Sequence, residues 1–141
     1  MVSEKVSAEW VHDQTFLLHD RNGFPIVESQ PHGVVASDLL PLSLIGCSIY
    51  DVTSILRKQK QDIQRLEVEA FSEQDDEPPW CFRRIRVLYR IWGQGIKREA
   101  VERAIRLTEE KYCSVFATLK SALEIVSEYE ILSEQEGVKS E

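Results

Sequence analysis

The segment 38–59 constrains the fold most, because apolar side chains occupy almost every side of the helix that it would form. These side chains are Leu39, Leu40, Leu42, Leu44, Ile45, Ile49, Val52, Ile55 and Leu56. A helix that is apolar all round has to be buried all round. A chain of 141 residues builds one domain and rarely encloses a helix completely. We therefore expect a second subunit to supply part of the cover.

The same segment is not expected to cross a membrane, because Ser43, Ser48 and Asp51 interrupt it and a span needs about 20 apolar residues. The first ten residues carry charges and lack the apolar centre of an export signal. Seventeen Lys and Arg against 24 Asp and Glu give a net charge of −7, which disfavours binding to nucleic acid or to an anionic membrane. These features predict a cytoplasmic protein with neither kind of partner.

The remaining patterns predict an α+β fold, since runs of strands are separated by whole helices. Besides the helix at 38–59, helical spacing covers 97–112 and continues from Cys113 to Leu123. A loop is expected over 72–79, and Asp38 suits the N-cap of the first helix. We expect a single domain over 1–132 and a polar, flexible tail over 133–141. Strand patterns are found at 6–12, 15–19, 24–28, 66–70, 84–91 and 124–132.

The three cysteines are an odd number, widely spaced, and argue against a disulfide framework. No CxxC or HxxxH spacing occurs, so no metal site is predicted. Cys47 is either a small core thiol or a reactive one, and its neighbour Gly46 would allow close approach by another backbone or a substrate. Cys113 ends a helix and could pair with a second thiol or simply pack there. Cys81 is interpreted as a packing residue.

Charged residues offer fewer candidates. Asp38 is either the N-cap or a carboxylate that positions a catalytic arginine or the substrate, and Arg21 is interpreted as a solvated turn residue. Four arginines near the fifth strand pattern could form a nucleic-acid strip, but the excess of acids favours a solvated sheet face. They are Arg83, Arg84, Arg86 and Arg90.

Two segments together resemble the signatures of the OsmC/Ohr family, the osmotically inducible and organic-hydroperoxide-resistance proteins. Residues 37–48 read SDLLPLSLIGCS and resemble its first signature, in which an acid and two leucines precede a glycine and a cysteine. Residues 104–115 read AIRLTEEKYCSV and resemble its second signature, A-I-x-L-S/T-x-x-K-Y-C-P-V. The resemblance extends from about residue 6 to residue 132, with both cysteines in order.

The resemblance implies an intertwined homodimer whose central cysteine-bearing helices pack against antiparallel sheets. It also implies a peroxidase for organic hydroperoxides, with Cys47 oxidised first and Cys113 resolving the product to a disulfide. An external dithiol, of the lipoyl type in family peroxidases, would reduce that disulfide, and no bound cofactor is implied. By the same resemblance, Asp38 stands where the divergent OsmC-like branch has its glutamate, and Arg21 is the only arginine that precedes Cys47.

This chain departs from the family pattern at three places. Ser37 stands where the best-studied peroxidases have glutamate, Asp38 is one methylene shorter than glutamate, and Ser114 replaces the usual proline. The alternative function is therefore a dimeric binding protein that holds a small ligand at its interface without efficient peroxidase activity. A purely structural or nucleic-acid-binding dimer that uses the arginine-rich strand is the second alternative.

Overall fold

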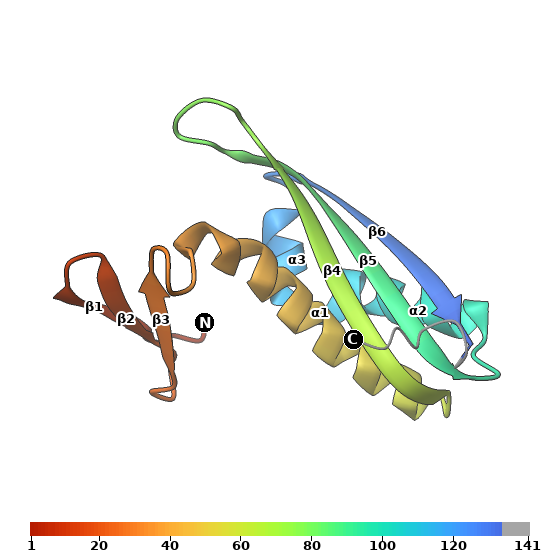
Figure 1. Ribbon diagram of the computed structural model, residues 1–141. Helices are drawn as coiled ribbons and strands as arrows, with labels where there is room; N and C mark the ends of the chain where they lie inside the picture. The colour runs from red at the N-terminus through yellow and green to blue at the C-terminus, as the bar shows by residue number, and fades with distance from the viewer. Residues whose placement is uncertain (134–141) are drawn as a thin grey trace. The chain divides into compact units, whose positions relative to one another are not determined.

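The computed structural model describes residues 1–133, and its contacts divide the chain into two compact units. The N-terminal unit is Met1–Leu40, and the C-terminal unit begins at Pro41 (Figure 1). The single domain expected over 1–132 stays a prediction. The expected tail 133–141 lies outside the described residues, except for Ser133.

The N-terminal unit is a three-stranded antiparallel sheet in the order β1–β2–β3. Its second turn forms as the sequence predicts. Asp20 Oδ1 accepts the backbone N–H groups of Asn22 at 2.9 Å and Phe24 at 2.8 Å, and Gly23 takes a φ of 88° that favours glycine. The strands are β1 (Ser7–His12), β2 (Thr15–His19) and β3 (Pro25–Ser29).

No residue of these three strands is fully buried, and β1 is exposed along its whole length. Trp10 is 69% exposed and Phe24 is 69% exposed, although both are large and apolar. The sheet therefore has no core of its own. Other large apolar side chains exposed in this unit are Val6, Val11, Ile26, Val27 and Val35.

The C-terminal unit contains a second sheet in the order β4–β5–β6. Strand β4 pairs antiparallel with β5, whereas β6 pairs parallel with β5. The parallel pairing is possible because helices connect these two strands. The predicted antiparallel arrangement holds for β1–β3 and for β4 with β5, and β6 departs from it. The strands are β4 (Asp62–Gln74), β5 (Phe82–Gln94) and β6 (Glu124–Leu132).

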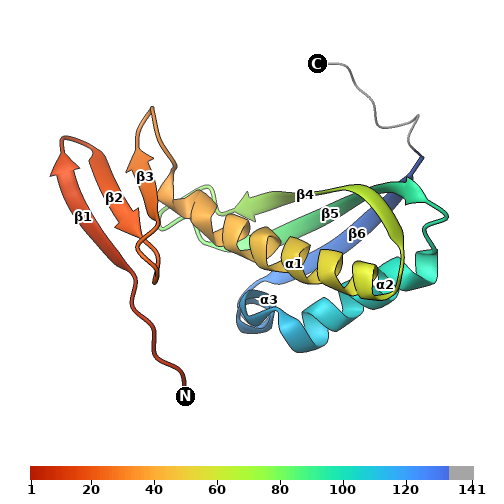
Figure 2. The same cartoon turned by 90° about the horizontal axis from the view of Figure 1, so that it is seen from below.

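Helices α1 (Leu39–Lys58) and α2 (Arg98–Leu107) cover one face of this sheet (Figures 1 and 2). The alternating residues of β5 that face them are at most 1% exposed, as the strand pattern predicts. Together with the buried residues of the helices they form one core. Its members are Leu44, Val52, Leu56, Ile85, Val87, Tyr89, Ile91, Val101, Ala104, Ile105 and Leu123.

Within the single chain, α1 is buried along one stripe rather than all round. Leu44, Ser48, Val52 and Leu56 recur every fourth residue and face the core. Elsewhere on the helix Leu42 is 49% exposed. The second subunit that would cover the other sides stays a prediction.

The span Ala36–Lys58, with a mean hydropathy of 1.6, is the one described helix long and apolar enough to cross a membrane by length and composition. The three polar residues Ser43, Ser48 and Asp51 therefore do not exclude a span by length and composition, contrary to the sequence argument. Its buried stripe packs in the core beside β5.

Three local expectations fail. Asp38 is not the predicted N-cap, because it belongs to a 3-10 turn, Ala36–Asp38, that precedes α1. The expected loop 72–79 is shorter, because β4 continues to Gln74 and pairs Ser72 with Ile85. The helical pattern 97–112 does not end as a regular α-helix, because α2 stops at Leu107 and a π-helical turn follows, in which Tyr112 is 59% exposed.

The outer face of the sheet carries arginines that are paired with glutamates. Arg86 Nη1 lies 3.1 Å from Glu128 Oε2, and Arg90 pairs with both Glu69 and Glu130. This face of the sheet is solvated, as the sequence predicts. Glutamates of β4 and β6 pair with the positive charges of its arginines.

Candidate active site

The C-terminal unit brings two of the three cysteines together. Cys47 is half-buried on α1, and Cys113 is 2% exposed in the segment between α2 and α3 (Ser114–Leu119). Both are free thiols, and Cys113 is among the groups that raise the pKa of Cys47, so the two side chains are neighbours. The two cysteines that the family resemblance pairs thus lie in the same cluster of side chains.

A π-helical turn, Thr108–Tyr112, places Cys113. The Cys113 backbone N–H donates to the Thr108 carbonyl oxygen at 2.8 Å, and Thr108 Oγ1 donates to the Ala104 carbonyl oxygen at 2.8 Å. Cys113 then takes an extended conformation and its sulfur accepts the backbone N–H of Phe116 at 3.3 Å. Single π turns recur at functional sites because they redirect a side chain within a helix.

The surroundings of Cys47 hold its thiol in the protonated form. Cys47 Sγ lies 3.9 Å from Asp51 Oδ2, one helical turn later. Burial, then the hydrogen bond and charge of Cys113, then the charge of Asp51 raise the pKa of Cys47 to about 11, against a weaker opposing hydrogen bond at the Val115 backbone. None of these groups, all drawn from residues 1–133, is a cation. Nucleophilic attack by Cys47 therefore needs a cation from elsewhere.

Tyr89, on β5, is 1% exposed and interacts with Ser48 of α1. Burial raises the pKa of Tyr89 to about 12, a hydrogen bond with Ser48 opposes this, and the charges of Glu109, Cys113 and Asp51 add to it. The phenol is therefore neutral at physiological pH. Its interaction with Ser48 joins β5 to the buried stripe of α1.

Glu109 adds a second half-buried acid to this cluster. Its Oε1 accepts the Ser127 hydroxyl at 2.6 Å, and burial raises its pKa. The described residues contain no group of three or more His, Cys, Asp or Glu side chains arranged to hold a metal ion. The cluster is thus a thiol pair among acids.

The other predicted site residues lie in the N-terminal unit. Arg21 is in the turn between β2 and β3, with its Nη1 3.4 Å from Glu4 Oε1. Asp38 is exposed in the 3-10 turn. Cys81, interpreted from the sequence as a packing residue, lies in the C-terminal unit immediately before β5. It is not among the groups that act on Cys47.

Sequence reasoning missed three parts of the site: Asp51, Tyr89 and the backbone N–H of Phe116. Asp51 stands four residues after Cys47, which puts both on one face of a helix, so the spacing carried the signal. Tyr89 was recognised only as a strand residue that faces inward. The N–H of Phe116 had no signal in the sequence, because it depends on where α3 begins.

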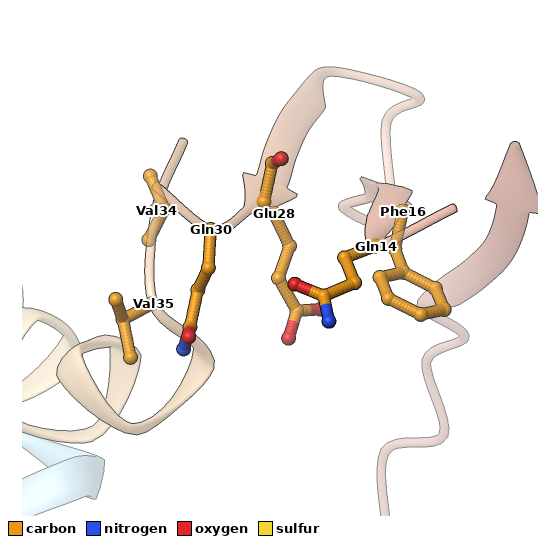
Figure 3. Close-up of a pocket in the computed structure, with 7 residues that line it drawn as sticks. Gln14, Phe16, Glu28, Gln30, Val34 and Val35 are labelled. Atoms are coloured by element: carbon orange, nitrogen blue, oxygen red, sulfur yellow. The ribbon is translucent and has the colours of Figure 1, made fainter. Parts of the chain in front are cut away.

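The N-terminal unit has a shallow pocket of about 210 Å³ within itself (Figure 3). Both apolar and polar side chains line it, among them Phe16, Glu28 and Val35. It contains neither cysteine, so it is not the thiol site.

Comparison with known proteins now decides the family. Residues 29–128 match the family described as OsmC-like protein. Protein YhfA of Escherichia coli K12 is 37% identical over 128 residues, which are 89% of this chain and 96% of YhfA. The chain belongs to the OsmC family.

Solved structures agree on the fold of this OsmC-family chain. A hypothetical protein from Aquifex aeolicus VF5 has a TM-score of 0.85 and 28% identity, covering 95% of this chain and 99% of its own. An organic hydroperoxide resistance protein from Elizabethkingia anophelis has a TM-score of 0.69 and 11% identity, covering 93% and 99%. The second similarity shows a shared fold only. The α+β fold class predicted from the sequence is confirmed.

Proposed function

We propose that this OsmC-family protein is a cysteine-based peroxidase that reduces organic hydroperoxides through Cys47 and Cys113. The observation that supports this best is the interaction between the two thiols, one on α1 and the other directly after the π-helical turn. The organic hydroperoxide resistance protein from Elizabethkingia anophelis shares the fold, which is consistent with the proposal.

The reaction balances with these two residues and an external reductant. The Cys47 thiolate attacks the distal oxygen of ROOH, the O–O bond breaks, and the alkoxide takes a proton to leave as ROH. Cys47 is then a sulfenic acid. The Cys113 sulfur attacks the Cys47 sulfur and expels hydroxide, which leaves as water once protonated. A dithiol reduces the resulting disulfide and becomes a disulfide itself.

The proposal requires a cation beside Cys47; the family resemblance implies an arginine from an N-terminal loop, and Arg21 is the only arginine that precedes Cys47. We propose that it acts in a homodimer, with Asp38 positioning it. The exposed apolar face of the N-terminal sheet supports dimer formation, because such a face is stable only when covered. Space for an approaching group exists as well, since a Cβ at Gly46 would meet nothing within 4 Å.

A second function is favoured by one observation, the Cys47 pKa of about 11. If nothing in the assembled protein lowers it, Cys47 is a poor nucleophile at neutral pH. The protein would then be a dimeric binding protein for a small ligand.

Consumption of cumene hydroperoxide in the presence of dihydrolipoamide tests the proposal. We expect Cys47→Ser to abolish turnover, Cys113→Ser to allow a single oxidation without turnover, and Cys81→Ser to behave as the wild type. Undiminished activity of Cys47→Ser, or no consumption by the wild type, would contradict the peroxidase and leave the binding function. Loss of activity in Cys81→Ser alone would contradict the assignment of the cysteines.

A further inference from the structure

The two sulfurs of a Cys47–Cys113 disulfide differ in how easily a reductant reaches them. Cys113 is 2% exposed, whereas Cys47 is half-buried and lies beside Gly46, where a Cβ would meet nothing within 4 Å. Thiol–disulfide exchange needs the attacking thiolate to approach one sulfur directly, so access decides which sulfur is attacked. The geometry directs attack to Cys47.

The two sulfurs also differ as leaving groups. Cys113 Sγ accepts the backbone N–H of Phe116 at 3.3 Å, and this donor is fixed by the first turn of α3. Cys47 also has a backbone hydrogen bond, at Val115, but the charge of Asp51, whose Oδ2 lies 3.9 Å from Cys47 Sγ, has the larger effect and opposes negative charge on a departing sulfur. A hydrogen bond to a charged group contributes more than one to a neutral group, so the Phe116 N–H strengthens as charge develops on Cys113.

We propose that the reductant attacks the Cys47 sulfur, and that the backbone N–H of Phe116 is a catalytic group that stabilises Cys113 as the departing thiolate. This rests on the proposed function, since it concerns the disulfide which that cycle forms. The reductant thiolate forms a bond to the Cys47 sulfur while the bond between the two cysteine sulfurs breaks. Its electron pair stays on Cys113, which then takes a proton. The second thiol of the reductant attacks the mixed disulfide and releases Cys47, and the reductant leaves oxidised by two electrons.

The same hydrogen bond acts in the forward direction. When Cys113 attacks the oxidised Cys47, it attacks from a position already set by its backbone and by the Phe116 N–H. The family's usual proline at the next position is replaced by Ser114, so in this chain the α3 start depends more on the Cys113 cap. In the reduced protein Cys113 therefore caps α3. It is the attacking sulfur when the disulfide forms and the leaving group when the disulfide is reduced.

The test uses full-length protein with Cys81→Ser, oxidised by diamide so that the disulfide forms without peroxide. The disulfide is treated briefly with 2-mercaptoethanol, quenched with acid, alkylated, and mapped by peptide mass. We expect at least about tenfold more 2-mercaptoethanol adduct on Cys47 than on Cys113 in the folded protein, and similar amounts in guanidinium chloride. An excess of adduct on Cys113, an even distribution in the folded protein, or no disulfide with diamide would overturn the inference.

Diamide replaces the peroxide, so a protein without peroxidase activity still forms the disulfide and gives a readable result. Failure of the inference is therefore distinct from failure of the proposed function.

The leaving-group role is tested by a matched pair of variants, Phe116→Pro and Phe116→Ala. Both variants lose the ring, but only the first loses the N–H. We expect exchange at Cys47 to be about tenfold slower in Phe116→Pro than in Phe116→Ala. Equal rates would overturn the role of the N–H. If Phe116→Pro does not fold, the distribution of adduct in the Cys81→Ser protein still decides the site of attack.

Discussion

The two units differ in what they bury. The C-terminal unit has a continuous core in which Ile85, Val52 and Leu56 are each 0% exposed. The N-terminal sheet has no fully buried strand residue, and Trp10 and Phe24 are each 69% exposed. The difference teaches that the first 40 residues cannot be stabilised by their own packing, since an isolated small sheet needs an apolar face that is covered.

The chemistry is divided in the same way. Both cysteines and the acids around them belong to the C-terminal unit, whereas Arg21 belongs to the N-terminal unit. The C-terminal unit by itself keeps Cys47 protonated. The proposed activity therefore depends on what the N-terminal unit of one or the other chain contributes.

The largest expected effect comes from removing core side chains. Ile85→Ala should lower the free energy of unfolding by about 2–5 kcal/mol, because it leaves a cavity in a closed core. Ile26 lies in the N-terminal sheet and is 37% exposed. In protein dilute enough to be monomeric, Ile26→Ala should lower the free energy of unfolding by less than about 1 kcal/mol. Chemical denaturation measures both. Equal losses would mean that the two units do not differ in packing.

The next effect concerns the ionisation of Cys47. Its pKa of about 11, set by the C-terminal unit, lies above the ordinary value of 9.0, so the protonated thiol is favoured in the folded state. By linkage, the stability contributed by that proton is present below about pH 9 and is lost as the pH rises toward 11. If Arg21 lowers this pKa in the dimer, Arg21→Met should slow alkylation of Cys47 at pH 8 by about 100-fold.

Alkylation rates against pH, in protein whose Cys81 is replaced by serine, give the apparent pKa directly. Arg57→Met, at an exposed position near the end of α1, is the matched control and should leave the profile unchanged. An inflection near pH 11 in both wild type and Arg21→Met would contradict the role of Arg21 and favour the binding function.

A smaller effect is expected at Gly46. Within the single chain alanine fits there and favours the helix by about 1 kcal/mol, so Gly46→Ala should raise the stability of dilute protein. If a substrate or a second chain approaches this position, the same change should lower peroxide turnover by about tenfold. Thermal unfolding and steady-state rates measure the two effects. Unchanged turnover would show that the open side of Gly46 is not used.

The smallest effect is expected at Glu109. Burial raises the pKa of this carboxyl, so its protonated form favours folding, and stability falls as the pH rises through that raised pKa. Glu109→Gln keeps the hydrogen bond with Ser127 and carries no charge. We expect it to stabilise the protein at pH 7 by less than about 1 kcal/mol and to flatten the pH dependence in the acid range. Urea denaturation at several pH values checks both.

The sequence predicted much of this architecture because the relevant signals are local. The turn at Asp20, the strand from Glu124 and the inward-facing residues of β5 follow from spacing and residue type alone. What it missed depends on distant pairing. The β4 strand extends through Ser72 because Ile85 pairs with it, and β6 is parallel because the helices return the chain to the same end.

The site shows the same limit. The positions of Cys47 and Cys113 were predicted through two sequence signatures, but their electrostatic surroundings were not. Asp51 raises the Cys47 pKa, while Tyr89 and Glu109 come from other elements. Such effects depend on burial and on contacts between elements, which a periodic pattern does not encode.

The most direct test of the two-cysteine cycle is the intact mass of the reduced protein before and after one equivalent of an organic hydroperoxide. The account predicts a loss of about 2 Da within seconds, mapped by peptide digestion to a bond between Cys47 and Cys113. An unchanged mass after minutes, with both thiols still open to alkylation, would contradict it.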